Sequence, residues 1–528
     1  MAFRVLITDP LSEEGIKPLR NEPSVDIDVA TELSGEELKT KIADADALLV
    51  RSQTKVTREI INQAKQLKII GRAGVGVDNI DLDAATERGI IVVNAPNGNT
   101  NSAAEHTMAM LMSLSRRIPQ AYQSLKNQQW ERKKYVGVEL KNKTLGIVGL
   151  GRIGAEVAHR AKGQRMKVIA YDPFLTEEKA ENLGIDYGSF EEVIQKADFI
   201  TVHTPLLKET KHLINADAFN MMKPGIHIVN CARGGIIEEN ALYDAIISKK
   251  VAGAALDVFE EEPFYDHKLL DLPEVIATPH LGASTVEAQE NVAIDVSEDV
   301  ISFLAKGSVK NPVNLPSVSS EALGKIEPYF NLAEKLGIFL SYLSNDVAEK
   351  INIYYSGDLS GVEIAPITRN TIKGLLTRHL GTHVNDVNAF YLADKKGITI
   401  HENKTSKARG FTNLLTVEVE TKSGTRSVSG TLLNGLGPRI VEIDDYSVDV
   451  TPKGHIVVIH HKDQPGVIGK MGNLLAQHDV NIATMQVDRS DVGGNAIMML
   501  TVDKYLENKE KEALIRLEEI RDVTAVDL

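Results

Sequence analysis

The sequence is poor in cysteine, in aromatic residues and in long apolar runs. Its 528 residues include one cysteine, Cys231, one tryptophan and 5% aromatic residues. A single cysteine excludes an intramolecular disulfide and gives no sign of an oxidising compartment. No run approaches the ~20 apolar residues that span a bilayer, and the opening MAFRVLITDP lacks the apolar stretch of a signal peptide. We therefore expect a cytoplasmic protein with no membrane partner.

Positive charge is also scarce. The chain carries 59 Lys and Arg against 73 Asp and Glu, which gives a net charge of −14. Such a protein repels nucleic acids and anionic membranes over most of its surface, so we expect no nucleic-acid partner. An anionic small molecule must instead meet a local group of basic residues. The length alone suggests about three to four domains.

One glycine motif indicates a nucleotide cofactor. The apolar segment TLGIV runs into G-x-G-x-x-G at Gly149, Gly151 and Gly154, and a second apolar segment, KVIAYD, ends on Asp172. The first glycine permits a tight turn, the second a close approach to pyrophosphate, and the third close packing of the helix. The amides at the helix start face the phosphates, and Asp172 can accept hydrogen bonds from both ribose hydroxyls. The pattern predicts a Rossmann unit that binds NAD.

Strand and helix patterns divide the chain into several units. Short apolar strands alternate with helices over the first hundred residues, which predicts a parallel sheet covered on both faces. Long helices are predicted on either side of the Rossmann unit, over 101–129 and over 285–307. We expect the second helix to return the chain to the first lobe. The Rossmann unit would then be an insertion, and the cleft between the lobes would hold cofactor and substrate.

The C-terminal part predicts two further domains. A proline-rich, polar linker at 311–318 precedes a segment of mixed pattern, and the end of the chain has the order βαββαβ. The predicted fold is α/β: two doubly wound parallel-sheet lobes, with a Rossmann domain inserted in a flavodoxin-like domain, then an α+β domain and a ferredoxin-like domain. The predicted boundaries are 1–98 with 290–316, then 99–289, 317–452 and 453–528.

Three polar segments follow Rossmann strands, where ligands of open α/β sheets bind: NCARGG at 230–235, DVFEEEP at 257–263 and TPHLG at 278–282. Oxidation of an alcohol by hydride transfer needs a base for the hydroxyl proton and a cation for the substrate. His280 is suited to be the base because imidazole titrates near neutrality. Glu262 can fix the tautomer of that ring, and Arg233 can hold a carboxylate through two parallel bonds.

These motifs, in this order and spacing, resemble those of the D-2-hydroxyacid dehydrogenases. The resemblance implies that Arg233, Glu262 and His280 are catalytic. It implies further cofactor contacts from Arg152, Ile153, Thr204, Cys231, Ala232, Asp257 and Gly282. Cys231 is expected to offer only its backbone, because a nucleophilic thiol has no base partner here. His106 is expected to be structural, and no metal is expected.

Other motifs are similar to the long-form phosphoglycerate dehydrogenases of that family: RSQTKV at 51–56, GRAGVGVDNID at 71–81, NAPNGNTNSAAEHT at 94–107 and WERKKYVGVEL at 130–140. The resemblance implies NAD-dependent oxidation of D-3-phosphoglycerate to 3-phosphohydroxypyruvate, the first step of L-serine synthesis. It also implies an intervening domain that resembles an allosteric substrate-binding domain, a regulatory ACT domain, and a homotetramer.

The predicted substrate residues are Arg51, Ser52, Gly74, Val75, Gly76, Asn99 and Arg132. Backbone amides at 74–76 can hold a carboxylate, although plain turn glycines are an alternative. Arg132 lies on a segment that could reach across a dimer. Lys55 and Lys133 are phosphate candidates too, with solvated surface lysines as the equal alternative.

The ACT segment contributes a predicted effector site. Its loop carries His461 and Asp463, and Asn481 follows the next helix. The resemblance implies L-serine as the effector, bound where two ACT domains meet, with a purely structural pairing module as the alternative. Some relatives carry asparagine in place of Asp463, so the identity of the ligand stays open.

Two other functions stay open. A dehydrogenase of an unphosphorylated 2-hydroxy acid would share the catalytic residues. An NAD-sensing, corepressor-like binding protein would share the fold, but its tail is typically disordered, whereas this tail has the pattern of two folded domains.

Overall fold

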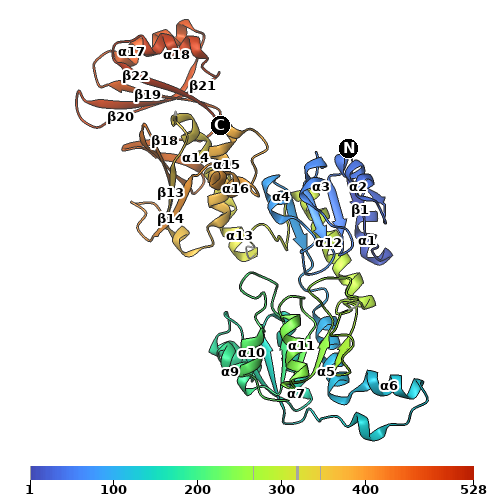
Figure 1. Ribbon diagram of the computed structural model, residues 1–528. Helices are drawn as coiled ribbons and strands as arrows, with labels where there is room; N and C mark the ends of the chain where they lie inside the picture. The colour runs from blue at the N-terminus through green and yellow to red at the C-terminus, as the bar shows by residue number, and fades with distance from the viewer. Residues whose placement is uncertain (1, 266, 317–319, 345) are drawn as a thin grey trace.

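Four β-sheets organise the part of the chain that the structure describes. The computed structural model describes residues 2–265, 267–316, 320–344 and 346–528. A five-stranded sheet is followed by sheets of seven, six and four strands. Figure 1 shows the N-terminal lobe with the seven-stranded lobe below it and the last two sheets to its upper left. No helix among these residues has both the length and the apolar character needed to cross a bilayer.

The N-terminal lobe is a parallel sheet with helices on its faces. Its strand order is β2-β1-β3-β4-β5, and every neighbouring pair is parallel. This is the flavodoxin-like order that the sequence predicted. The ALLV run of β3 is fully buried, as expected for a strand covered on both faces. The elements are β1 Phe3–Ile7, α1 Glu13–Arg20, β2 Val25–Val29, α2 Gly35–Lys41, η1 Ile42–Asp44, β3 Ala47–Val50, α3 Arg58–Gln63, β4 Ile69–Arg72, α4 Leu82–Glu87 and β5 Ile91–Asn94.

The seven-stranded lobe is the predicted Rossmann unit. Its strand order is β12-β11-β10-β9-β6-β7-β8, all parallel, so the order reverses between β6 and β9. Ligands of such sheets bind at that reversal, outside the carboxyl ends of the strands. The elements are β6 Thr144–Val148, α7 Arg152–Gly163, β7 Lys167–Tyr171, α8 Glu177–Leu183, β8 Asp186–Tyr187, α9 Phe190–Lys196, β9 Phe199–Val202, α10 Ala216–Met221, β10 Ile226–Asn230, α11 Glu239–Ile247, β11 Val251–Leu256 and β12 Val275–Ala277.

Two helices make the Rossmann lobe an insertion. α5, Thr100–Arg116, enters it, and α12, Val286–Lys306, runs back along the N-terminal lobe (Figure 1). Ser297 of α12 donates a 2.9 Å hydrogen bond to the carbonyl of Gly15 in α1. Val313 then donates a backbone hydrogen bond to β5. The chain therefore returns to the lobe where it began, as the sequence predicted.

The single helix predicted over 101–129 is wrong. α5 stops at Arg117, whose φ of 55° is left-handed, and α6, Ile118–Lys126, follows. Pro119 explains the break, because its ring lacks an amide hydrogen and collides with the carbonyl four residues earlier. α6 and the short helix η2, Arg132–Tyr135, project away from the lobe (Figure 1).

The third sheet has mixed strand directions. Its order is β14-β13-β15-β16-β17-β18, with β13 and β14 parallel and the other neighbours antiparallel. The long helices α14 and α15 share its apolar core. Ser317 and Val318 of the predicted linker lie outside the described residues. The elements are α13 Ser320–Ile326, α14 Pro328–Leu343, β13 Lys350–Gly357, η3 Asp358–Gly361, α15 Ala365–Leu380, α16 Ala389–Lys395, β14 Thr399–Thr405, β15 Asn413–Thr421, β16 Gly424–Leu433, β17 Gly437–Ile443 and β18 Tyr446–Val450.

The last sheet is antiparallel, and its strand β19 packs against apolar cores on both faces. Its order is β20-β21-β19-β22, the ferredoxin-like arrangement predicted from the sequence. Val457 and Ile459 of β19 pack with the domain's own helices, whereas Ile456 and Val458 join the core of the preceding domain. The two C-terminal domains are therefore packed together through one apolar core. The elements are β19 His455–Lys462, α17 Val467–Gln477, β20 Ile482–Arg489, β21 Asn495–Val502, α18 Asn508–Ile515 and β22 Ile520–Asp527.

Candidate active site

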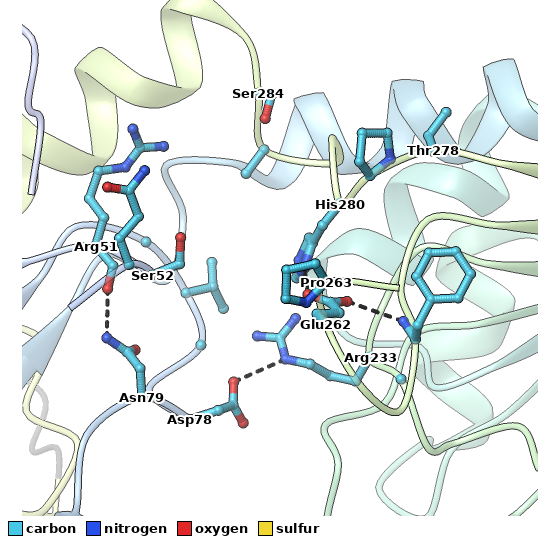
Figure 2. Close-up of a pocket in the computed structure, with 18 of the residues that line it drawn as sticks. Arg51, Ser52, Asp78, Asn79, Arg233, Glu262, Pro263, Thr278, His280 and Ser284 are labelled. Carbon is cyan, nitrogen blue, oxygen red and sulfur yellow. Dashed lines mark hydrogen bonds and ion pairs between the residues drawn. The ribbon is translucent and has the colours of Figure 1, made fainter. Parts of the chain in front are cut away.

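A cleft of about 1050 Å³ lies between the N-terminal lobe and the Rossmann lobe. The loops at the carboxyl ends of strands from both sheets line it, and Figure 2 shows their side chains facing one another across it. The sequence-predicted residues that line it are Arg51, Ser52, Gly74, Val75, Gly76, Asn99, Arg233, Glu262 and His280. Arg132 does not line the cleft, because η2 carries it away on the projecting segment.

The His280 ring is held by Glu262. Nδ1 of His280 lies 2.8 Å from Oε2 of Glu262, while Oε1 of Glu262 accepts a hydrogen bond from the amide of Phe259. Burial opposes ionisation of Glu262, but the hydrogen bond from His280, the charge of His280 and the bond from the Phe259 amide together outweigh burial, so the pKa of Glu262 lies below its ordinary value. A carboxylate at Nδ1 leaves Nε2 as the proton-accepting nitrogen. The pair therefore has the arrangement of a general base with an orienting anion.

The backbone at His280 is strained and fixed. Its φ of 56° is left-handed, which costs a residue with a side chain about 1 kcal/mol or more. Its amide donates to the carbonyls of Asp257 and Thr278 at 2.9 and 3.0 Å. These bonds fix the turn that directs the imidazole into the cleft.

Asp257 anchors the loop that carries His280. Its side chain is fully buried and accepts hydrogen bonds from the hydroxyl of Thr278 and from the amides of Leu281 and Gly282, at 2.6, 2.7 and 2.8 Å. Burial opposes its ionisation, but hydrogen bonds, with that from His106 foremost, outweigh burial and lower its pKa. Asp257 and Gly282, both expected at the cofactor, are thus bonded to each other. His106, 3.2 Å from Asp257, supports the same loop.

Arg233 reaches across the cleft to the N-terminal lobe. Its Nε donates to Oδ2 of Asp78 at 3.2 Å, and its Nη1 donates to the carbonyl of Ala232 at 2.7 Å (Figure 2). Asn230 shapes the loop by donating to the carbonyl of Arg233 and accepting from the amide of Ala232. Within the described residues Nη2 has no partner, so it is available to a ligand in the cleft.

The opposite wall is built around Asp9. This buried carboxylate accepts the amides of Arg51 and Thr54, at 2.6 and 3.1 Å, and Asn79 donates to the carbonyl of Arg51 (Figure 2). The side chain of Arg51 is thereby left to face the cleft. The wall therefore positions a guanidinium opposite the catalytic candidates.

The glycine loop of this wall differs from the expectation in one respect. The amide of Gly74 donates to the carbonyl of Arg72 at 2.8 Å, so it is not free to hold a ligand, because the chain closes a tight turn over Ala73. The amides of Val75 and Gly76 keep that possibility. Oδ1 of Asn99 is buried without a partner within the described residues. The sequence reasoning missed Arg72, Asp78 and Asn79, although they stand in the GRAGVGVDNID motif; it attended only to the glycines.

The glycine motif of the Rossmann lobe fits a dinucleotide. Gly149 has a φ of 95° and packs on the carbonyl of His203, while Gly154 packs on the carbonyl of Gly149. The space beyond Gly151, the residue just before α7, is open, and no side chain caps that helix. The amides of Arg152 and Ile153 at the helix start can therefore face an anion.

The other cofactor candidates surround this motif. Asp172 lies at the end of β7 and accepts hydrogen bonds from the amides of Leu150 and Phe174, which hold its carboxylate at the motif. The hydroxyl of Thr204 is buried without a partner within the described residues. Cys231 is buried, and burial raises the pKa of its thiol to about 12, so at neutral pH it is an inert thiol.

The predicted effector residues do not come together within one chain. Asp463 lies at the end of the ACT sheet where β19 meets Asn495, and it accepts hydrogen bonds from Arg489 and from the amide of Gly493. Asn481 lies at the other end, bonded to Asp503. Eight-residue strands separate the two ends by about 25 Å. His461 is buried near Asp463, and its Nδ1 is 2.9 Å from the carbonyl of Lys462.

Comparison with protein-family models gives three matches. Residues 108–282 match the NAD-binding domain of D-isomer specific 2-hydroxyacid dehydrogenases. Residues 325–444 match the D-3-phosphoglycerate dehydrogenase intervening domain, and residues 455–519 match the ACT domain. Residues 108–282 therefore form an NAD-binding domain of the kind found in the D-isomer specific 2-hydroxyacid dehydrogenases.

Full-length relatives narrow this class. A D-3-phosphoglycerate dehydrogenase of Bacillus subtilis is 48% identical over 526 residues, covering 100% of both chains. One of Methanocaldococcus jannaschii is 44% identical over 526 residues, covering 99% of this chain and 100% of the other. The chain belongs to the D-3-phosphoglycerate dehydrogenase family.

Solved enzyme structures match about three fifths of the chain. A glyoxylate reductase from Paecilomyes thermophila has 30% sequence identity and a TM-score of 0.55, covering 59% of this chain and 98% of its own. A D-lactate dehydrogenase from Aquifex aeolicus, solved with NAD and lactic acid, has 29% identity and a TM-score of 0.52, covering 60% and 100%.

Proposed function

We propose that this protein oxidises D-3-phosphoglycerate to 3-phosphohydroxypyruvate with NAD. The observation that carries the proposal is the cleft itself, where a carboxylate-held histidine faces an arginine whose Nη2 has no partner within the described residues. The names of the full-length relatives support the choice of substrate. Arg51 and the amides of Val75 and Gly76 supply contacts for the anionic groups of that substrate on the opposite wall.

Each catalytic side chain has a defined task in this proposal. Nη2 of Arg233 binds the C1 carboxylate and polarises the bond between C2 and its oxygen. Nε2 of His280 takes the proton of the 2-hydroxyl, and Glu262 at Nδ1 balances the imidazolium that results. NAD, when bound at the glycine motif, supplies the acceptor for the hydride of C2. The 2-hydroxyl oxygen loses a proton and C2 loses a hydride, so the alcohol becomes a ketone.

Turnover of competing substrates tests this function. We expect NADH formation from D-3-phosphoglycerate to exceed that from D-glycerate or D-lactate, because only the first carries a phosphate for the basic wall. Preference for an unphosphorylated acid would instead make the protein another 2-hydroxyacid dehydrogenase. The absence of NADH formation from all three would favour the binding-protein alternative.

We also propose that the reaction is the first step of L-serine synthesis and that L-serine is its feedback effector. Because Asp463 and Asn481 lie at opposite ends of one ACT sheet, a site that contains both must form between two copies of the chain. Calorimetry should detect L-serine binding that weakens in Asn481→Ala, while Asn220→Ala, an exposed position on α10 of the Rossmann lobe, serves as a control. Absence of heat with the parent protein would reject the effector assignment.

The proposal includes an assembly and a location. Exposed apolar side chains line the projecting α6 segment, including Tyr122 at 61% and Trp130 at 78% exposure. A second copy packed there would cover them and could receive Arg132 at its cleft. We propose a cytoplasmic homotetramer, and light scattering tests the assembly. The proposed domain boundaries are 1–98 together with 290–316 for the first domain, then 99–289, 317–452 and 453–528.

A further inference from the structure

Glu262 reaches His280 from a short irregular segment, residues 259–262, that follows β11. This segment contains no helix and no strand, so neither a helical turn nor a sheet ladder fixes its backbone. The Glu262 side chain is 37% exposed, so burial does not fix it either. The place of its carboxylate beside His280 (Figure 2) therefore depends on what holds the 259–262 segment.

A carboxylate outside the cleft holds this segment. Glu239 is the first residue of α11, and its Oε1 accepts a hydrogen bond from the amide of Glu260 at 2.7 Å. An acidic residue in the first turn of a helix usually interacts with the free amides of that helix. Here the bond goes instead to a residue 21 positions later, in the segment that carries Glu262. Glu239 is not among the residues that line the cleft, so it acts on the site through that segment.

The Glu239 carboxylate has one hydrogen-bond donor in the part of the chain that the structure describes, and that donor is the Glu260 amide. The side chain of Glu239 is only 15% exposed. Burial raises the pKa of its carboxyl, and the bond from the Glu260 amide is the largest contribution that opposes this rise. Nε2 of His267 lies 3.8 Å from Oε2, which is too far for a hydrogen bond. The carboxylate is therefore directed at the segment.

Other contacts of the segment transmit the position of Glu260 to Glu262. A methyl group on Gly234 would overlap the carbonyl of Phe259, so the neighbouring loop lies directly against the segment. The amide of Phe259 donates to Oε1 of Glu262 at 3.1 Å, so the backbone and the side chain of the segment are bonded to each other. The side chain of Glu260 has a second contact, 3.0 Å from Nε2 of His212. A shift of Glu260 would consequently displace the Glu262 carboxylate.

We infer that Glu239 is a positioning residue, whose bond to the Glu260 amide keeps the Glu262 carboxylate at Nδ1 of His280. This inference rests on the proposed function and adds to it a residue outside the cleft. The reach of the Glu239 side chain is what matters, because the amide needs an acceptor oxygen at this place and not a charge. Without the bond, Glu262 leaves His280 for part of the time, which lowers kcat and leaves the binding of NAD and substrate unchanged.

Two substitutions of Glu239 separate reach from charge. Glu239→Asp keeps the charge but is one methylene shorter, so its oxygen no longer reaches the Glu260 amide. Its kcat for D-3-phosphoglycerate should fall about three- to tenfold, up to the loss expected when Glu262 loses its charge, while KM and the Kd for NAD stay within about twofold. Glu239→Gln keeps the reach without the charge, and its kcat should stay within about twofold of the parent. Glu191→Asp, an exposed glutamate in the first turn of α9, is the matched control.

A double variant tests whether the effect passes through Glu262. If Glu239 acts only by placing that carboxylate, Glu239→Asp should cause no further loss of kcat in a Glu262→Gln protein. Losses that multiply in the double variant would overturn the inference. So would a parental kcat in Glu239→Asp, or a larger loss in Glu239→Gln than in Glu239→Asp.

Hydrogen exchange separates this inference from the proposed function. Mass spectrometry of the full-length proteins should show faster exchange in peptides that cover 257–263 in Glu239→Asp, and parental exchange in Glu239→Gln and in the control. Equal exchange in all four proteins would overturn the role of Glu239, whichever acid the enzyme oxidises. A parent that forms no NADH from any 2-hydroxy acid tested would refute the proposed function, while the exchange comparison would still judge Glu239.

Discussion

The contact between Glu262 and His280 can be weakened without changing its shape. In Glu262→Gln the side chain keeps its size and loses its charge, so the 2.8 Å contact at Nδ1 no longer balances an imidazolium. A hydrogen bond to a charged group contributes roughly 1.5–3 kcal/mol. His280 is 47% and Glu262 37% exposed, and screening by solvent places the loss at the lower end, about 1.5 kcal/mol. This predicts a fall of about tenfold in kcat/KM.

The pH profile of kcat/KM measures this loss. The pKa of Glu262 lies below its ordinary value in the folded protein. The carboxylate therefore keeps its negative charge until the pH falls through this lowered pKa. The ratio of parent to Glu262→Gln kcat/KM should therefore shrink as the pH falls through the lowered pKa of Glu262, because the parent then loses the same charge. Glu261→Gln, an exposed neighbour with the same charge change, is the control. A Glu262→Gln variant within about twofold of the parent at every pH would refute the reasoning.

Three further substitutions or treatments have defined outcomes. Asp257→Asn should lower the free energy of unfolding by roughly 1–3 kcal/mol at neutral pH. Because the pKa of Asp257 is lowered, the difference in Tm between the variant and the parent should shrink as the pH falls below about 4. A difference in Tm that stays constant with pH would contradict this. Cys231 should resist iodoacetamide in the native protein and react in urea, as followed by mass spectrometry; rapid native labelling would show that its thiol is not buried. Gly149→Ala should weaken NAD binding and lower the free energy of unfolding by about 1–3 kcal/mol. The φ of Gly149 is 95°, and an added methyl would lie 2.7 Å from the carbonyl oxygen of His203. The control Gly163→Ala, which has open space around it, should leave both properties unchanged.

The sequence was sufficient to predict the residues that follow the Rossmann strands. The carboxyl ends of parallel strands meet at one edge of a sheet, so Arg233, Glu262 and His280 could be assigned to one site from their strands alone. The cofactor role of the glycine motif and Asp172 was predicted from the fingerprint itself, in which one strand runs into the glycines and the next strand ends on an acid. These predictions depend on local patterns that the topology then brings together.

Contacts between lobes could not be predicted in this way. Nothing in the local sequence indicates that Asp78 meets Arg233, 155 positions away, or that Nε of Arg72 is buried without a partner among the described residues. The effector residues pose the same difficulty. Asp463 and Asn481 looked like one site in sequence, but their strands carry them to opposite ends of a sheet.

Local patterns also misled where other forces set the backbone. The apolar periodicity of 101–129 continues through a proline that ends α5. Strand β14 has no strand pattern in its sequence, because six of its seven residues are exposed and the alternation that marks a half-buried strand is absent. Its backbone is nevertheless paired along its length with β13. Strand pairing of this kind is a tertiary property.

Replacement of His280 by alanine tests the central claim most directly. NADH formation from D-3-phosphoglycerate and NAD binding by fluorescence titration are measured on the same His280→Ala protein. Loss of the base should lower kcat by about 10²–10⁴-fold. The Kd for NAD should stay close to that of the parent, because the glycine motif and Asp172 are untouched. A variant that keeps normal turnover would contradict the account.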